Sequence, residues 1–194
     1  MSVTISFKLS DRDIEHFKSL AQDARKALES GQDADAIIGA ARSMLDETRE
    51  ATDLPDFVST RLEQLGQLIA MLEDAEWQLE DEDRNRVLSA MAYFLNPDDL
   101  IPDRVPGIGF LDDAIMIELI ALEFQDEIDS FQEFCAYRTA EEQRRSNKGQ
   151  DVAVAREDWL ASKRAALQQR MRKRRNERFS TGGGGRSGWR SSLW

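Results

Sequence analysis

The chain has 194 residues, of which 41% are hydrophobic and 32% are charged, and its formal net charge is -11 at pH 7. This apolar content is enough to bury a core, which excludes a wholly disordered chain. The charge is unevenly spread: residues 163–194 contain ten of the 26 Lys/Arg and one of the 37 Asp/Glu, which leaves 16 basic and 36 acidic residues in 1–162. The C-terminal segment therefore carries about +9 and the body about -20. Such an acidic body repels nucleic acid and anionic membranes, so only the C-terminal segment has the charge to approach either.

The chain contains one cysteine, Cys135, and one histidine, His16. A single thiol forms no internal disulfide, as is typical of the reducing cytoplasm. We expect Cys135 to be a buried, inert thiol and His16 to be an ordinary surface or boundary residue. The longest apolar run, residues 114–122, is interrupted by Glu118 and is far shorter than the roughly 20 residues that span a bilayer. The N-terminus has no apolar signal core, so we expect a cytoplasmic protein.

The N-terminal residues 3–9 alternate between apolar and polar side chains, which predicts a short β-strand. A lone strand needs a partner for its backbone groups. Two arrangements satisfy it: the strand packs as an arm on the helices, or it pairs with the same strand of a second subunit in a homodimer.

Helical spacing of apolar residues dominates the rest of the chain. It predicts helices over 10–30, from 33 past 45, from 55 to 79, from 81 to 95, from 112 to about 143, and from 151 onward. The third has a bundle seam from Val58 to Leu79, and the fifth is apolar almost all round, as in a central helix. The interpretation is an N-terminal arm (1–9), a helical domain (10–145), a basic C-terminal helix (146–179) and a disordered Gly/Arg/Trp tail (180–194).

The segment between Tyr93 and Ile120 is unusually rich in proline and aspartate. Three of the four prolines and five aspartates lie between residues 97 and 113, which predicts a stiff turn. The segment resembles the YkvA family (domain of unknown function 1232), a bacterial domain whose hallmark is an Asn-Pro-x-Asp-x-Ile-Pro-Asp turn followed by Pro-x-x-Gly-x-x-Asp-Asp. The matching residues are Asn96, Pro97, Asp99, Ile101, Pro102, Asp103, Pro106, Gly109, Asp112 and Asp113.

The resemblance implies a helical hairpin around the turn, and it implies no reaction because none is established for the family. The flanking helices resemble a longer, soluble proteobacterial form. Many relatives have apolar, membrane-associated flanks. The body of this chain is charged instead, so membrane behaviour is not carried over.

The aspartates of the turn have two interpretations. In the first they are structural: Asp112 or Asp113 caps the helix that follows, and Asp99 and Asp103 cap a short helical turn. In the second the four carboxylates converge on a hard cation such as Mg²⁺ or Ca²⁺. Their spacing is not that of an EF-hand loop.

The basic segment has candidate partner-binding residues in Arg172, Lys173, Arg174, Arg175 and Trp189. Arginine and tryptophan in a flexible chain suit stacking on unpaired RNA bases, or contact with anionic lipid. Docking of the segment on the chain's own acidic body is a third possibility. The fourth is a charge-balancing extension with no fixed partner.

The sequence thus predicts an all-α bundle of about five to six helices with a short N-terminal strand and a disordered C-terminal tail. We interpret it as a non-enzymatic interaction or adaptor module with an unidentified protein partner, and no catalytic residue stands out. One alternative is a divalent-cation-binding protein or metal-dependent enzyme that uses the aspartate-rich turn, and it would need a metal-bound water as base. The other is nucleic-acid binding through the basic tail.

Overall fold

A computed structural model of the chain describes residues 33–50, 54–95 and 110–181, together with a few positions between 10 and 19. Several predictions from the sequence lie outside these residues. They concern the strand at 3–9, most of the helix at 10–30, the turn at 96–109 and the tail beyond 181.

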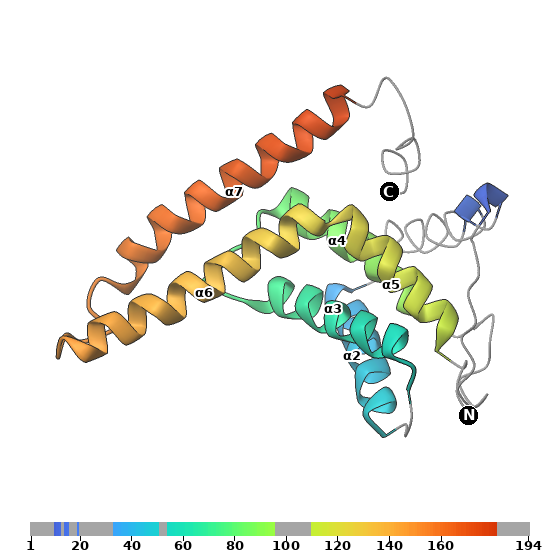
Figure 1. Ribbon diagram of the computed structural model, residues 1–194, viewed down its shortest axis with the longest axis horizontal. Coiled ribbons are helices and arrows are strands. Elements are labelled where there is room, and N and C mark those ends of the chain that lie inside the picture. The colour runs from blue at the N-terminus through green and yellow to red at the C-terminus, as the bar shows by residue number, and fades with distance from the viewer. Residues whose placement is uncertain are drawn as a thin grey trace.

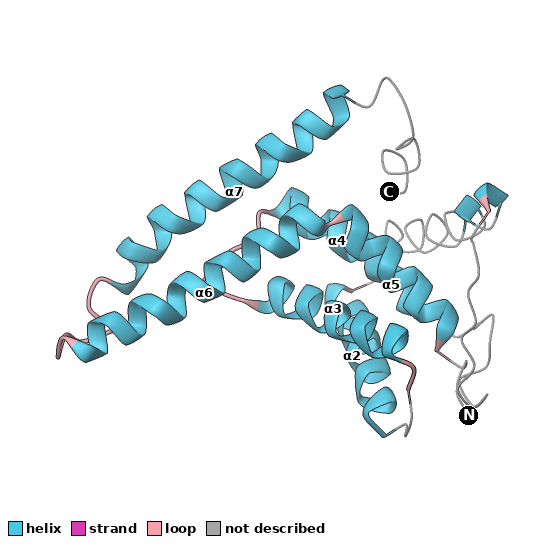
Figure 2. Ribbon diagram, in the orientation of Figure 1, coloured by secondary structure: helices cyan, strands magenta, loops and turns pink. Residues whose placement is uncertain are grey.

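The described part of the chain is helical and contains no strand (Figure 2), which confirms the all-α class for that part. Its elements are α2 (Ala34–Glu50), α3 (Asp56–Glu73), α4 (Asp81–Met91), the 3₁₀ helix η1 (Ala92–Leu95), α5 (Leu111–Glu123), α6 (Gln125–Asn147) and α7 (Arg156–Thr181). Among these helices, none combines the length and the apolar character needed to cross a bilayer.

The core forms where α3 packs on α5 (Figure 1), and α2 packs on α3 and also contacts α4 and η1. The predicted seam of α3 is confirmed: its buried members are Val58, Leu62, Leu65, Ile69 and Leu72. Helix α5 is buried on most sides, as its apolar sequence predicts, and its fully enclosed residues include Met116, Ile117 and Ile120. Burial of apolar surface from these two helices is the main stabilising contribution to the bundle.

Helix α3 ends at Glu73, six residues before the predicted end at Leu79. The cause is the side chain of Asp74, whose Oδ1 accepts hydrogen bonds from the backbone N–H groups of Glu76 (2.9 Å) and Trp77 (2.8 Å). This local bonding competes with continuation of the helix. The turn that results, residues 74–80, carries Trp77 into the core.

The predicted single helix from 112 to 143 is instead two helices, α5 and α6, which meet at a bend at Phe124. The backbone of Phe124 leaves helical geometry (φ -99°, ψ 22°), and its ring is fully buried. The predicted polar break at 144–150 is also wrong in its start, because α6 continues to Asn147. A short turn follows, in which Asp151 Oδ1 accepts a hydrogen bond from the N–H of Ala153 (2.8 Å), and α7 begins at Arg156 rather than near the predicted residue 151.

Trp77 joins the bundle to the C-terminal hairpin. Its side chain is fully buried, with ring centroids 5.2 Å from Phe134 and 6.0 Å from Phe131 of α6. Its backbone carbonyl accepts a hydrogen bond from Gln168 Nε2 of α7 at 3.0 Å. Residues 74–80 therefore position α7 as well as ending α3.

Candidate interaction site

Helix α7 returns along α6 as the second arm of a hairpin (Figure 1). Its buried apolar side chains are Leu160, Leu167 and Met171, each no more than 2% exposed. Spacings of seven and four residues place all three on one face of the helix. This narrow stripe fixes which side of α7 faces the bundle.

Carboxylates line the surface that α7 covers. We call this surface the acidic face and define it by Glu76, Glu80, Asp83, Glu127, Glu133 and Glu142. They come from the α3–α4 turn, from α4 and from α6. Segments distant in sequence thus form one negatively charged surface for a single helix.

The N-terminal half of α7 is fixed to this face by Arg156 and Lys163. The Arg156 guanidinium binds both oxygens of Glu76 and pairs with Glu142 at 2.5 Å. Lys163 Nζ lies 2.8 Å from Glu133 Oε1. The hydrogen bond from Arg156 holds the pKa of Glu76 below its ordinary value, and the bonds from Lys163 and then Arg170 do the same for the pKa of Glu133. These carboxylates are therefore held in their charged forms.

The C-terminal half of α7 is held by three arginines. Arg170 pairs with Glu133, and Arg172 lies 2.6 Å from Glu80. Arg175 pairs with Asp83, and its Nη1 is 3.6 Å from Glu127. Gln168 adds a buried neutral contact through the Trp77 carbonyl.

The most buried of these contacts surrounds Asp83 and Glu127, whose side chains are 3% and 2% exposed. Arg86 of α4 binds Asp83 at 3.3 Å, Glu127 at 3.2 Å and Glu123 at 3.5 Å. Burial raises the pKa of Glu127, and the neighbouring charge of Arg86 opposes that shift. The group is an ion network at the junction of α4, α5, α6 and α7.

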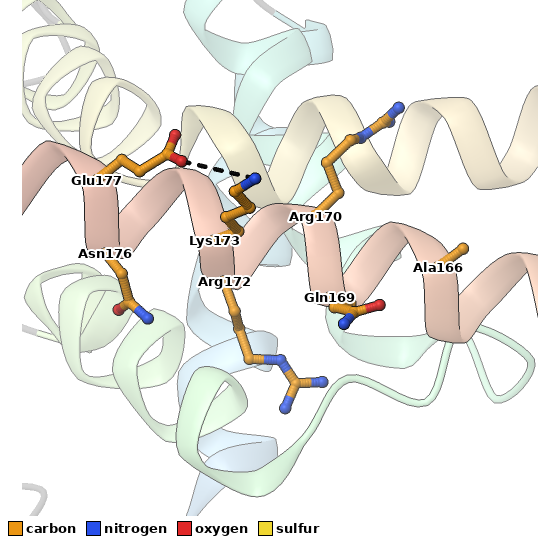
Figure 3. A pocket seen from close by; sticks show the side chains of 7 residues that line it. All are labelled: Ala166, Gln169, Arg170, Arg172, Lys173, Asn176 and Glu177. Carbon is orange, nitrogen blue, oxygen red and sulfur yellow. Dashed lines mark ion pairs between the residues drawn. The ribbon is translucent and has the colours of Figure 1, made fainter.

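The four basic residues predicted to bind a partner fall on two sides of α7. Arg172 and Arg175, three residues apart, face body carboxylates. Lys173 and Arg174 are exposed (Figure 3 shows Lys173), and within the described part of the chain no carboxylate pairs with Arg174. The ion pair that Lys173 makes in the described chain is with Glu177 of the same helix, at 3.9 Å. RNA or lipid binding therefore remains a prediction that depends on Lys173, Arg174 and the residues beyond 177. Trp189 lies outside the described residues.

The outward side of α7 is an open depression, lined in the described chain by one helix alone (Figure 3). Its lining residues are Ala166, Gln169, Arg170, Arg172, Lys173, Asn176 and Glu177. Arg170 and Arg172 point to opposite sides of the helix there, each toward its own carboxylate.

The structure describes two of the four aspartates predicted to bind a metal. Asp112 and Asp113 are buried in the first turn of α5, whose N-cap position is Phe110. The capping prediction is therefore wrong in position, although both carboxylates still lie near the positive end of the helix dipole. Asp99 and Asp103 lie outside the described residues, so the Mg²⁺ or Ca²⁺ site stays a prediction. Elsewhere in the described chain no cluster of three or more ligating side chains has the arrangement of a metal site.

Cys135 is half-buried rather than buried. Burial raises the pKa of its thiol, and Arg138 Nη2 lies 3.6 Å from its Sγ. A raised pKa disfavours the reactive thiolate, as expected of an inert cysteine. His16 lies outside the described residues.

Sequence reasoning missed Trp77 and the carboxylates that receive α7. The charge asymmetry between body and tail was a signal that the two attract, but it does not select individual partners. The pairing of Asp83 with Arg175, 92 residues apart, depends on the tertiary fold. One local signal was available, because the four-residue spacing of Glu123 and Glu127 would place them on one face of the single helix predicted from 112 to about 143.

Fold and site together define a helical bundle that carries a basic helix on an acidic face. A family model described as "Protein of unknown function (DUF1232)" matches residues 86–119. This match confirms the resemblance to the YkvA family for that segment. The matched range covers the second half of α4, η1 and most of α5 but none of α2, α3, α6 or α7, and it gives no support to a specifically proteobacterial form. Neither a curated protein nor a solved structure matches the chain significantly.

Proposed function

We propose that the chain is a non-enzymatic interaction module whose acidic face binds a basic amphipathic helix, and that α7 is the chain's own ligand for this face. The observation that carries the proposal is the set of ion pairs between α7 and body carboxylates on either side of a narrow apolar stripe. Recognition of an amphipathic helix by a complementary surface uses the same combination of apolar anchors and flanking charges.

The contact between α7 and the acidic face is weak enough for another helix to replace α7 there. Most of its ion pairs are partly exposed: the side chains of Arg172 and Glu80 are 38% and 49% exposed. Exposed pairs contribute about 0–1 kcal/mol each and weaken in salt. The apolar stripe buries only Leu160, Leu167 and Met171. A helix held in this way is displaced more readily than one of the core.

The covalent attachment of α7 to the bundle affects how strongly a partner helix binds. Because α7 is covalently attached, its effective concentration at the acidic face is high, and a second helix must compete with it. Weakening α7 should therefore increase binding of an external helix. A partner, or a modification that removes positive charge from α7, would act in the same direction.

The test is a titration of a fluorescent peptide of residues 156–181 with full-length protein. The variant Arg170→Ala/Arg172→Ala/Arg175→Ala should bind the peptide more tightly than the wild type, because its own α7 competes less well. Lys173→Ala/Arg174→Ala is a matched control, since it removes two exposed charges of the same helix. Its affinity for the peptide should be close to that of the wild type.

The proposal also requires dependence on sequence and on salt. A peptide of the same composition in scrambled order should bind more weakly, and affinity should fall as salt increases. If the wild-type protein and both variants bind the natural peptide no more tightly than the scrambled one, the acidic face is not a helix-binding site.

A further inference from the structure

We infer that the buried carboxylates Asp83, Glu123 and Glu127 form an arginine-binding site that selects which helices the acidic face accepts. We call these three residues the carboxylate cage. The inference rests on the proposed function, because it identifies the feature by which that site would recognise a partner. The partner class is a protein helix with an arginine at one defined position.

Charge is the first argument for the cage. Its three carboxylates come from α4, α5 and α6, and Arg86 is the cation that these helices supply to it in the described chain. For its two most buried members, Asp83 and Glu127, Arg86 alone leaves one negative charge unbalanced. Arg175 of α7 supplies the second cation by pairing with both of these carboxylates.

Burial makes this imbalance costly. The side chains of Asp83 and Glu127 are at most 3% exposed, and that of Glu123 is 12% exposed. Carboxylates removed from water to this degree are stable only when cations and hydrogen bonds replace the lost hydration. The bundle thus leaves a demand for a second cation, and α7 meets it with a side chain that is itself only 17% exposed.

Arg86 cannot meet the demand alone because its position is fixed. Its guanidinium carbon lies 5.1 Å from the centroid of the buried Phe124 ring, at the bend between α5 and α6. From there it already reaches all three carboxylates. Arg175 Nη1 approaches the same two oxygens that Arg86 contacts, Asp83 Oδ1 and Glu127 Oε1, so that two guanidinium groups share them.

The site should favour arginine over lysine. A guanidinium is more weakly hydrated than an ammonium and stays charged when buried, so it loses less on entering a dry, acidic site. The stripe of α7 sets the position of this arginine: Met171 precedes Arg175 by four residues, Leu167 by eight and Leu160 by fifteen. A competing helix should carry apolar residues and an arginine at the same relative positions.

The test uses full-length protein with Arg175→Ala, in which the chain's own arginine no longer fills the cage. Peptides of residues 156–181 are titrated against it. Relative to the natural peptide, Arg175→Gln should weaken binding roughly 30-fold. Arg175→Lys should weaken it about tenfold, and the matched controls Arg174→Gln and Arg174→Lys less than about threefold. If Arg175→Lys binds as well as the natural peptide, or if Arg174→Gln loses as much as Arg175→Gln, the inference is wrong.

A second readout needs no external helix. In the full-length chain, hydrogen exchange of α7 amides over 167–177 should accelerate with Arg175→Gln, less with Arg175→Lys, and little with Arg174→Gln. If this order holds but no peptide binds, the proposed function fails while the cage stands as the arginine site for α7. If peptides bind without regard to residue 175, the cage fails and the proposed function stands.

Discussion

Helices α5 and α7 are stabilised in opposite ways. Helix α5 is apolar almost all round, with Met116, Ile117 and Ile120 fully enclosed. Helix α7 contributes a narrow apolar stripe, and ion pairs with six carboxylates supply most of its polar contacts. Hydrophobic burial depends little on pH or salt, whereas ion pairs depend on both. The bundle should therefore persist under conditions that release the helix.

The largest effect should come from the residue that serves both regions. Trp77→Ala removes a fully buried ring that packs on Phe131 and Phe134. We expect a loss of about 3–5 kcal/mol in the free energy of unfolding, measured by urea denaturation.

Trp159→Ala is the control for this substitution. Trp159 is only partly buried and lies between Tyr137, Arg145 and Arg156 at the start of α7. Trp159→Ala should lower the free energy of unfolding by clearly less than Trp77→Ala does. Equal losses for the two variants would mean that α7 belongs to the same cooperative core as α3 and α5, which would remove the contrast between the regions.

Much of the core was predictable from the sequence, because it depends on helical periodicity alone. The spacing of Val58, Leu62 and Leu65 determines one face of α3 wherever that helix lies. The end of α3 was not predicted, since a polar side chain, Asp74, interrupts an otherwise continuous apolar pattern. The bend at Phe124 has no marker such as proline or glycine in the sequence, and a fully buried phenylalanine is equally compatible with an unbroken helix.

The candidate site was predictable in its charge but not in its geometry. The basic run Arg172 to Arg175 was identified as one binding element, although helical spacing separates Arg172 and Arg175 from Lys173 and Arg174. Periodicity could have made that division before the fold was known. The choice of Asp83 and Glu127 as partners could not have been made, because α4 and α6 meet only in the folded chain.

A fall in pH should have an intermediate effect, which is the separation of α7 from the bundle. The pKa values of Glu76 and Glu133 are lowered from 4.5 by Arg156 and by Lys163 and Arg170. A lowered pKa stabilises the folded state fully above pH 4.5, and that contribution is lost as the pH falls through the folded pKa. Helix α7 should then separate before the core unfolds.

Hydrogen exchange and Trp159 fluorescence between pH 7 and pH 3 would follow this separation. Glu127 acts in the opposite direction, because a raised pKa favours the folded state at low pH and this contribution is lost as pH rises above 4.5. Its neighbours are Arg86, Asp83 and Arg175. The variant Glu76→Gln/Glu133→Gln should show weaker docking of α7 at neutral pH and a flatter acid response. An acid response identical to that of the wild type would assign the transition to other carboxylates.

The smallest effect should come from an exposed ion pair of α7, compared with an exposed arginine of the same helix that has no described partner. Arg172 and Glu80 are 2.6 Å apart but well exposed, so Arg172→Ala should lower the free energy of unfolding by about 0–1 kcal/mol. High salt should reduce even that difference, since screening already weakens the pair in the wild type. Arg174→Ala, two residues further along the helix and without a described partner, should change stability by less than about 0.5 kcal/mol. Urea denaturation of both variants at low and high salt makes the comparison. If Arg172→Ala costs several kcal/mol in high salt, the Glu80 contact is not a surface pair, and α7 is held more like α5 than the ion pairs suggest.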